Sequence, residues 1–161
     1  MFEKWSSSAL LASVIFTGFA APVRAQEPAR VKIGTFDSRA VIIAYVNSPQ
    51  SAPERQALME DKRLGPSRQH LMHQQAFSNA SIVNIVPKFK DKLPEIAARR
   101  GVVMIASRWE VPYADPAIET VDVTSDIVEL FKPTEKARKW IAQLEKVEPI
   151  PLQDVAYDPA H

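Results

Sequence analysis

The segment that follows Gly101 constrains the fold more than any other part of this chain. Residues 102–107 form a short apolar run rich in β-branched side chains, which is typical of a buried strand. Residues 109–113 alternate apolar and polar side chains, and Pro112 would restrict this second strand to the edge of a sheet. Thr124 then offers an N-capping hydroxyl for a short helix with one apolar face. The segment therefore predicts two neighbouring strands, a turn and a helix.

The first strand of the same sheet is predicted near the N-terminus. Residues 31–36 alternate well enough for a half-buried strand. Residues 39–46 are almost entirely apolar, and such a run is compatible with a helix or with a second buried strand. We favour the helix, because Asp37 and Ser38 occupy positions where N-capping residues belong.

Residues 50–100 predict a helical hairpin between the first strand and the later ones. Its first helix would cover residues 53–64, with a proline in its first turn, and a Gly-Pro turn would follow. Its second helix would cover residues 67–86, where apolar side chains recur at helical spacing. Pro87 would then kink or end this helix, because proline removes an internal hydrogen bond.

The C-terminal part predicts one more amphipathic helix over residues 134–147 and an extended tail over residues 149–161. We therefore expect one domain over residues 26–148. Its fold class would be α+β: a small sheet body, a protruding helical hairpin and an extra C-terminal helix.

Residues 1–25 predict a secretory signal peptide. An apolar run over residues 9–21 follows Lys4, and Val23 and Ala25 place small residues where signal peptidase cleaves. The alternative is a membrane anchor, but the run is shorter than the ~20 residues that cross a bilayer. We expect cleavage after Ala25 and export, into the periplasm if the host is Gram-negative.

Charge and cysteine content exclude several classes of function. The chain carries 20 Lys+Arg and 19 Asp+Glu, so no strong field attracts nucleic acid, and contact with a membrane surface is only a weak expectation. It contains no cysteine, which removes disulfides, thiol catalysis and thiolate metal sites.

Few residues suggest catalysis or metal binding. His70 and His73 are close on a predicted helix, but a zinc site needs three or four ligands and no third ligand is fixed by spacing. Glu110 and Asp115 could form a pair of hydrolytic carboxylates. The sequence lacks a nucleophile elbow, a zinc-protease motif and a glycine-rich phosphate loop. We predict no enzymatic activity, no metal and no cofactor; a hydrolase with scattered site residues is the enzyme alternative.

Three short segments resemble the Skp/OmpH family of periplasmic chaperones. Residues 32–41 (KIGTFDSRAV) are similar to the family's opening strand and helix, and residues 111–117 (VPYADPA) to its V-x-Y-A-D-P segment. Residues 122–128 (DVTSDIV) are similar to the start of its next helix. The part between these segments is far shorter than the family's coiled-coil arms. Residues 118–121 look inserted, and residues 134–147 lie beyond the family's usual end.

The resemblance implies an ATP-independent holdase that binds unfolded outer-membrane or other exported polypeptides and assembles as a trimer. The apolar stripe of the hairpin would contact the client, although packing against the partner helix is the alternative: its residues are Met72, Phe77, Val83, Val86 and Phe89. The body core or the subunit contact would use Ile33, Phe36, Val103, Ile105, Trp109 and Tyr113. The alternative function is a structural or adaptor protein of the envelope that keeps the trimer body without holdase activity.

Overall fold

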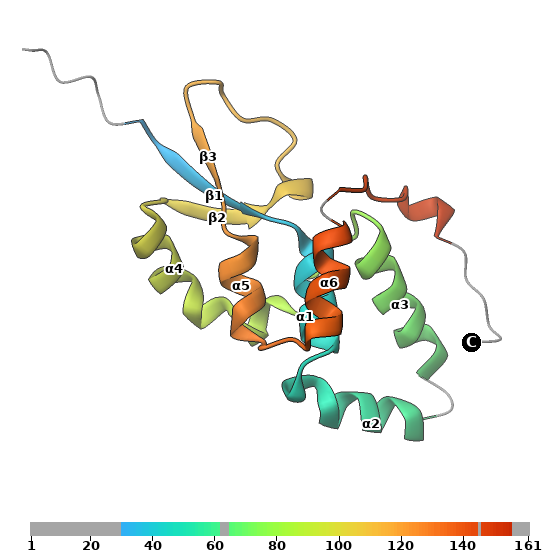
Figure 1. Ribbon diagram of the computed structural model, residues 1–161. Coiled ribbons are helices and arrows are strands. Elements are labelled where there is room, and N and C mark those ends of the chain that lie inside the picture. The colour runs from blue at the N-terminus through green and yellow to red at the C-terminus, as the bar shows by residue number, and fades with distance from the viewer. Residues whose placement is uncertain (1–29, 62–64, 145, 156–161) are drawn as a thin grey trace, which may run out of the picture.

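The computed structural model describes residues 30–61, 65–144 and 146–155. Helices gather on one side of a small sheet and extend beyond one end of it (Figure 1). This mixture of helices and a small sheet is compatible with the predicted α+β class. The predicted signal peptide and its cleavage point lie outside the described residues, as does the end of the predicted tail.

The sheet has three parallel strands, and the strand nearest the N-terminus is its centre. Strand β1 (Lys32–Phe36) pairs with β2 (Met104–Ser107) on one side and with β3 (Glu119–Asp122) on the other. Ile33 of β1 stands opposite Met104 of β2. The two segments far apart in the sequence therefore meet in one sheet, as predicted.

The prediction of a strand at residues 109–113 is wrong. The chain instead forms a 3₁₀ turn at Arg108–Glu110 and leaves the sheet. The cause is local: the Ser107 side chain accepts a hydrogen bond from the Trp109 backbone N–H (3.4 Å), which turns the chain directly after β2. Pro112 also lacks the N–H group that pairing in a sheet would use.

Strand β3 takes the place of the predicted strand, and it includes most of the residues that look inserted relative to the Skp/OmpH pattern. An ion pair between Lys32 and Glu119 (2.7 Å) joins β3 to β1. Because β2 and β3 lie on opposite edges, the connection over residues 108–118 must cross β1. Figure 1 shows this connection on the side of the sheet away from the helices.

Helix α1 (Ser38–Val46) lies at the centre of the helical layer, and eight of its nine residues are buried. It begins at the predicted cap, where the Asp37 carboxylate accepts a hydrogen bond from the Arg39 backbone N–H (2.9 Å). A helix that is apolar all round must be covered all round. The apolar run is therefore a helix, and the alternative of a second buried strand is excluded.

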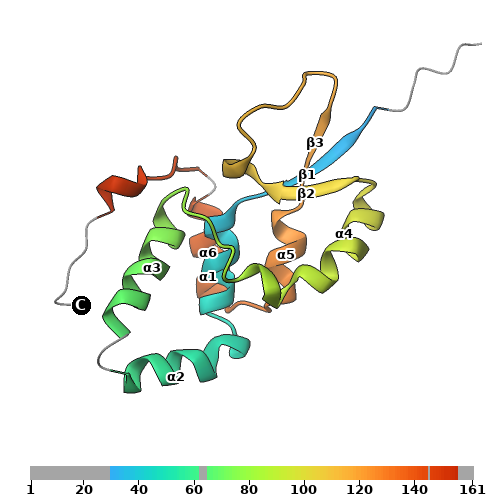
Figure 2. The ribbon, with the colours of Figure 1, turned by 180° about the vertical axis from the view of Figure 1, so that it is seen from behind.

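The hairpin predicted over residues 50–100 is divided into shorter pieces. They include α2 (Ala52–Glu60), α3 (Gly65–Phe77) and α4 (Leu93–Arg100), with 3₁₀ turns between α3 and α4. Pro53 lies at the start of α2, as expected. Figures 1 and 2 show α3 running beside α1, and the two helices are in contact. The protruding hairpin is therefore not confirmed.

Helix α3 ends about two turns before the predicted position at residue 86. Ser78 supplies the reason, because its hydroxyl donates to the Gln74 carbonyl (2.6 Å) and accepts from the Ala80 N–H (3.1 Å). These bonds replace the next helical hydrogen bonds with a turn. Pro87 then begins a 3₁₀ turn at Val86–Lys88 rather than kinking a helix.

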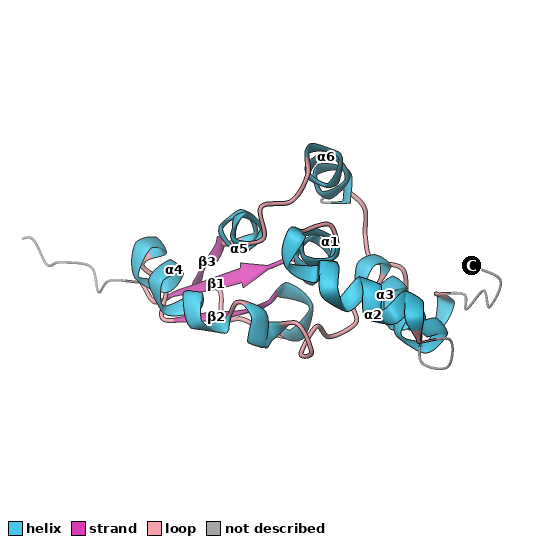
Figure 3. Ribbon diagram, turned by 90° about the horizontal axis from the view of Figure 1, so that it is seen from below, coloured by secondary structure: helices cyan, strands magenta, loops and turns pink. Residues whose placement is uncertain are grey.

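Two helices near the C-terminal end of the described chain, α5 (Thr124–Leu130) and α6 (Glu135–Leu144), pack against α1. Helix α5 forms in the predicted region, and α6 covers most of the predicted residues 134–147. The predicted cap at Thr124 is wrong: Val123 is the N-cap of α5, and the Thr124 hydroxyl instead accepts a hydrogen bond from the Asp37 N–H (2.9 Å). Figure 3 shows α4 and α5 against the strands and α1 continuing beyond the end of β1. The tail is tied to α3, because the Ile150 N–H donates to the Phe77 carbonyl (2.9 Å).

Aromatic rings connect the sheet to the helices in the core. Phe36 meets Phe89 edge to face with ring centroids 6.1 Å apart, and Phe89 meets Phe131 at 6.1 Å. Phe131 in turn meets Tyr45 at 5.5 Å. These rings belong to β1, to the turns before α4, to the end of α5 and to α1. The core therefore joins segments from the whole described chain.

Candidate functional site

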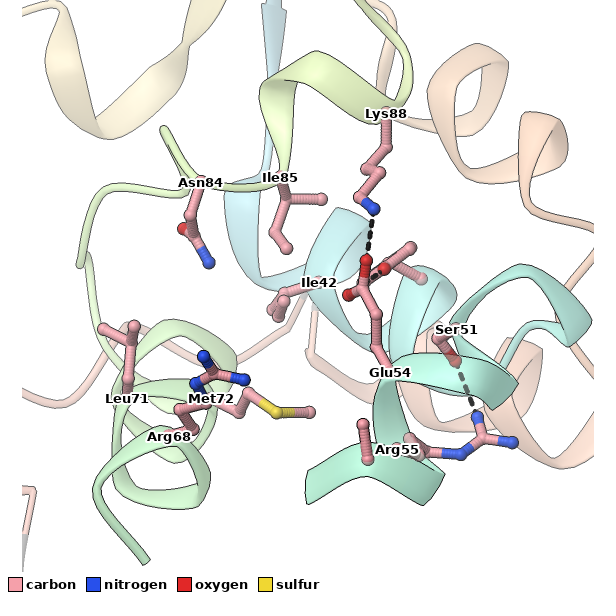
Figure 4. A pocket seen from close by; sticks show the side chains of 12 residues that line it. Ile42, Ser51, Glu54, Arg55, Arg68, Leu71, Met72, Asn84, Ile85 and Lys88 are labelled. Atoms are coloured by element: carbon pink, nitrogen blue, oxygen red, sulfur yellow. Dashed lines mark hydrogen bonds and ion pairs between the residues drawn. The ribbon is translucent and has the colours of Figure 1, made fainter. Parts of the chain in front are cut away.

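A cavity of about 460 Å³ lies between α1, α2 and α3, and Figure 4 shows the side chains around it. We call it the inner cavity. Its volume is within the range of ~300–1,000 Å³ that small-molecule sites usually have. Apolar side chains form its floor and one wall, and charged side chains stand at its edges. This combination makes it the candidate functional site.

The floor of the inner cavity is built by the core. Ile42 of α1 and Ile85 from the loop after α3 both line it and are both buried. Leu71 and Met72 form the wall on the α3 side, and Leu71 is 41% exposed. A hydrocarbon group that entered from solvent would therefore exchange water for an apolar surface already in place.

Tyr45, Glu54 and Lys88 form a polar cluster at one end of the inner cavity. The Glu54 carboxylate accepts hydrogen bonds from the Tyr45 hydroxyl and from the Lys88 ammonium group, and these bonds join α2 to α1 and to the loop before α4. The bond from Lys88, and then the bond from Tyr45, hold the pKa of Glu54 below its ordinary value. Burial, and then the bond to Glu54, raise the pKa of Tyr45. Glu54 is therefore an ionised carboxylate that already has partners.

Arginine side chains line the rest of the edge. Arg55 of α2 donates to the Ser51 hydroxyl (2.7 Å) and to the Val46 carbonyl. These acceptors carry no formal charge, so the positive charge of Arg55 is not neutralised by them. Arg68 of α3 also lines the cavity, and Figure 4 shows its guanidinium group turned toward the space between α3 and α2. The inner cavity thus has an apolar interior and a basic edge.

A second cavity, the outer cavity, lies on the other side of α3 and has a volume of about 340 Å³. It lies between α1, α3 and α6, and its lining includes Phe77 and Trp140, whose rings meet edge to face with centroids 6.3 Å apart. Ile42 and Met72 line both cavities. Helix α3 therefore has an apolar cavity on each side while it remains in contact with α1.

The predicted client-contacting residues have different environments. Met72 and Phe77 are half-buried and line the cavities beside α3, and Val86 is half-buried against the core. Val83 is 72% exposed in the loop after α3, whereas Phe89 is only 2% exposed in the core. The fold does not bring these five side chains onto one face.

The predicted residues of the sheet body also divide into buried and exposed groups. Ile33 and Phe36 are buried in β1, and Ile105 and Trp109 are half-buried. Val103 is 77% exposed and Tyr113 is 75% exposed. The last two side chains are therefore available for contact with a partner, while Ile33 and Phe36 support the sheet itself.

A buried ion pair lies at the end of β1, where the chain enters α1. Arg39 donates to both carboxylate oxygens of Asp37 (3.1 and 2.8 Å), and Trp109 donates to Asp37 Oδ1 (3.3 Å). Arg39 also donates to the carbonyl of Leu144, the last residue of α6 (3.3 Å), and to the carbonyl of Val147 beyond it (2.8 Å). Burial opposes ionisation of Asp37, but the hydrogen bonds and charge of Arg39 outweigh it and lower the pKa of this carboxyl group. All these groups bond one another, so the cluster is structural.

A second acidic residue joins two helices on the sheet side. Asp126 of α5 accepts hydrogen bonds from Arg99 (2.8 Å) and Arg100 (2.7 Å), the last two residues of α4. Burial opposes its ionisation as well, but the hydrogen bonds from the two arginines lower the pKa of Asp126. Its charged form is therefore favoured by the fold.

These lowered pKa values predict that acid destabilises the protein. Asp37 and Asp126 bind a proton less tightly in the folded chain than in the unfolded chain, where the ordinary value is 3.8. Their stabilising contribution is thus complete above that value and is lost as the pH falls through the lower folded pKa values. We expect the urea midpoint to fall below about pH 4. The Asp126→Asn variant should show a smaller fall; an equal fall in both proteins would contradict this assignment.

The residues weighed for catalysis and metal binding do not converge. Among the described residues, no group of three or more His, Asp, Glu or Cys side chains could hold a metal ion. Glu110 accepts a hydrogen bond from the Ser81 hydroxyl (2.6 Å), and Asp115 accepts one from the Ala117 N–H (2.8 Å). Each carboxylate thus has its own local partner. The absence of enzymatic activity stays a prediction.

Sequence reasoning missed the inner cavity because its polar residues have no local pattern. Glu54 is 9 residues from Tyr45 and 34 residues from Lys88 along the chain. No periodicity or motif links positions so far apart. The one signal in the sequence is that Glu54 and Lys88 have opposite charges. The sequence does not show that they form an ion pair, because they meet only when α2 packs against the loop before α4.

Comparison with family models, with curated proteins and with solved structures finds no match to this chain. Within the described residues, none of the helices combines the length and the apolar character that a membrane span requires.

Proposed function

We propose that this protein is an exported, ATP-independent holdase that binds unfolded polypeptides in the periplasm. The observation that carries the proposal is the apolar space on both sides of α3, about 460 and 340 Å³ in volume. Leu71 is partly exposed beside the inner cavity, and Met72 lines both cavities. Apolar side chains of a client would enter these cavities, and methionine adapts to many shapes.

The strength of such binding follows from the area that it buries. At about 25 cal/mol per Å² of apolar surface, a few hundred Å² yield only a modest gain after the cost of association. Binding would therefore be weak and reversible, as a holdase that releases its client without a nucleotide requires. The divided helices of the described chain offer no long arms, so the client would be held along α3 rather than enclosed.

The test is suppression of aggregation by the purified protein. We expect it to slow aggregation of a urea-denatured outer-membrane protein after dilution, and we expect Leu71→Gln to weaken binding about tenfold by removing apolar contact. Leu152→Gln is the matched control, because Leu152 is 42% exposed, much like Leu71, and lines neither cavity. Equal activity of the two variants would remove α3 from the proposal, and no suppression by the parent protein would refute it.

A structural or adaptor role in the envelope is the second candidate, and exposed apolar side chains around β2 favour it. Met104 of the edge strand β2 is 48% exposed. Val103 directly before this strand and Tyr113 in the connection after it are also exposed. Exposed apolar side chains suit self-association, including the trimer that the Skp/OmpH resemblance implies. Analytical sedimentation of the purified protein, with and without the unfolded client, distinguishes the two candidate functions. Assembly without any client binding supports the adaptor, whereas client binding supports the holdase.

A further inference from the structure

The inner cavity has more positive charge than its own residues neutralise. Arg55, Arg68 and Lys88 line it together with a single acidic side chain, Glu54. Glu54 is paired with Lys88, and Arg55 bonds only to uncharged acceptors. Arg55 and Arg68 therefore place positive charge at the edge of an apolar space, and Arg68 interacts with Glu54 only through the field of its charge. An apolar side chain of a bound polypeptide would form no ion pair with these arginines.

Arg68 is the residue best placed to receive a negative group. Its charge contributes to the lowered pKa of Glu54, but within the described residues the ion pair of Glu54 is with Lys88 and not with Arg68. Arg68 lies in the first turn of α3, which contains no acidic residue, and the start of a helix carries partial positive charge. Figure 4 shows its guanidinium group turned toward the cavity, with Leu71 and Met72 beside it. A guanidinium group in this position suits a carboxylate, which it can bind through two parallel hydrogen bonds.

We propose that the inner cavity binds a small amphipathic anion, a hydrocarbon chain that ends in a carboxylate. The chain would lie against Ile42, Ile85 and Met72, and the carboxylate would lie at Arg68. An uncharged hydrocarbon would fill the floor but leave the guanidinium group of Arg68 without an anionic ligand. A compact anion without a chain would pair with Arg68 but leave the apolar floor empty. Only a ligand with both parts uses both features of the cavity.

The chemistry predicts how affinity depends on the ligand. Each methylene that leaves water for the apolar floor should tighten binding about fourfold. The charge-assisted hydrogen bonds to Arg68 should add about tenfold. Dodecanoate should therefore bind more tightly than octanoate and more tightly than dodecanol, which has the same chain without the charge.

Calorimetric titration of the purified full chain with these three compounds, below their micelle concentrations, tests the proposal. We expect Arg68→Gln to weaken dodecanoate binding about tenfold and to leave dodecanol binding unchanged. Lys139→Gln is the matched control, because it removes one positive charge from the exposed face of α6 and lines neither cavity. Ala57→Trp should abolish binding of both compounds by filling the cavity from α2. Circular dichroism and urea unfolding confirm that each variant folds.

Three results would overturn the proposal: no binding of dodecanoate, equal effects of Arg68→Gln and Lys139→Gln, or full binding by a folded Ala57→Trp variant. Absence of dodecanoate binding would show that the ligand class is wrong. Equal effects of the two charge variants would show that Arg68 does not bind the carboxylate, and full binding by Ala57→Trp would show that the ligand binds outside the inner cavity. The proposal rests on the cavity and not on holdase activity. Failure in the titration and failure in the aggregation assay are therefore separate results.

Discussion

Asp37→Ala is expected to lower the free energy of unfolding by about 3–5 kcal/mol, as removal of one partner from a buried ion pair usually does. Asp37 and Arg39 are both almost fully buried, with side chains 1% and 2% exposed. Without the carboxylate, the guanidinium group keeps its charge in a place where little water can reach it. The change also removes the N-cap of α1, the helix at the centre of the fold.

The loss of stability in Asp37→Ala should exceed that of a single ion pair, because Asp37 and Arg39 also bond to other elements. The Asp37 N–H donates to the Thr124 hydroxyl at the start of α5 (2.9 Å), and Arg39 donates to one carbonyl group at the end of α6 and to another just beyond it. The guanidinium group also lies over the Trp109 ring, 5.2 Å from its centroid. The pair therefore holds α5, α6 and the start of the 108–118 connection in place around the end of β1.

Urea unfolding followed by circular dichroism measures the effect, and Glu119→Gln is the control. Glu119 is paired with Lys32, but both side chains are more than 40% exposed, so this variant should cost less than about 1 kcal/mol. The double variant Asp37→Ala with Arg39→Met should be more stable than Asp37→Ala alone, because it leaves no unpaired charge. A cost for Asp37→Ala as small as that of Glu119→Gln would show that the pair contributes little.

The parts of the fold that sequence reasoning predicted are those with a local physical signal. Asp37 and Ser38 marked the start of α1, and the structure shows the Asp37 cap. Gly101 directly follows the predicted hairpin, and it is the C-cap of α4 with φ 66°, which an L side chain rarely adopts. Each signal acts within a few residues of the element that it delimits. Such signals can be read without knowledge of what the element packs against.

The parts that could not be predicted depend on contacts between distant segments. The sequence ETVD of β3 carries little apolar alternation, and it is a strand because its backbone pairs with β1. Residues 109–113 do show alternation, but the Ser107 side chain turns the chain away from the sheet. The inner cavity has the same origin, since Glu54 and Lys88 meet only when α2 packs beside the loop before α4. Pattern alone cannot supply these contacts.

The apolar stripe of residues 72–89 is the clearest case of an ambiguous pattern. The spacing suggests one continuous helix face, but α3 ends at Phe77 and 3₁₀ turns follow. The turns direct Ile82, Ile85 and Phe89 into the core and leave Val83 exposed. Neighbouring apolar side chains therefore have different environments: Ile82 is buried in the core, whereas Val83 is exposed on the surface.

Phe89→Ala should consequently destabilise the fold rather than weaken client binding. Phe89 is 2% exposed and lies between the rings of Phe36 and Phe131. Its truncation removes two edge-to-face contacts and leaves a cavity at the centre of the core, which typically costs about 3–5 kcal/mol. Val83→Ala is the matched variant from the same apolar stripe, and its exposed side chain should contribute less than about 0.5 kcal/mol.

Urea unfolding of both variants measures this difference, and the aggregation assay provides the second reading. At a temperature where Phe89→Ala is still folded, its ability to hold a client should equal that of the parent protein, because a core side chain contacts no client. A variant that keeps its stability but loses client binding would place Phe89 on the binding surface, as the apolar spacing alone suggests. A variant that loses stability but not binding would assign Phe89 to the core and leave the residues beside α3 as the client-binding surface.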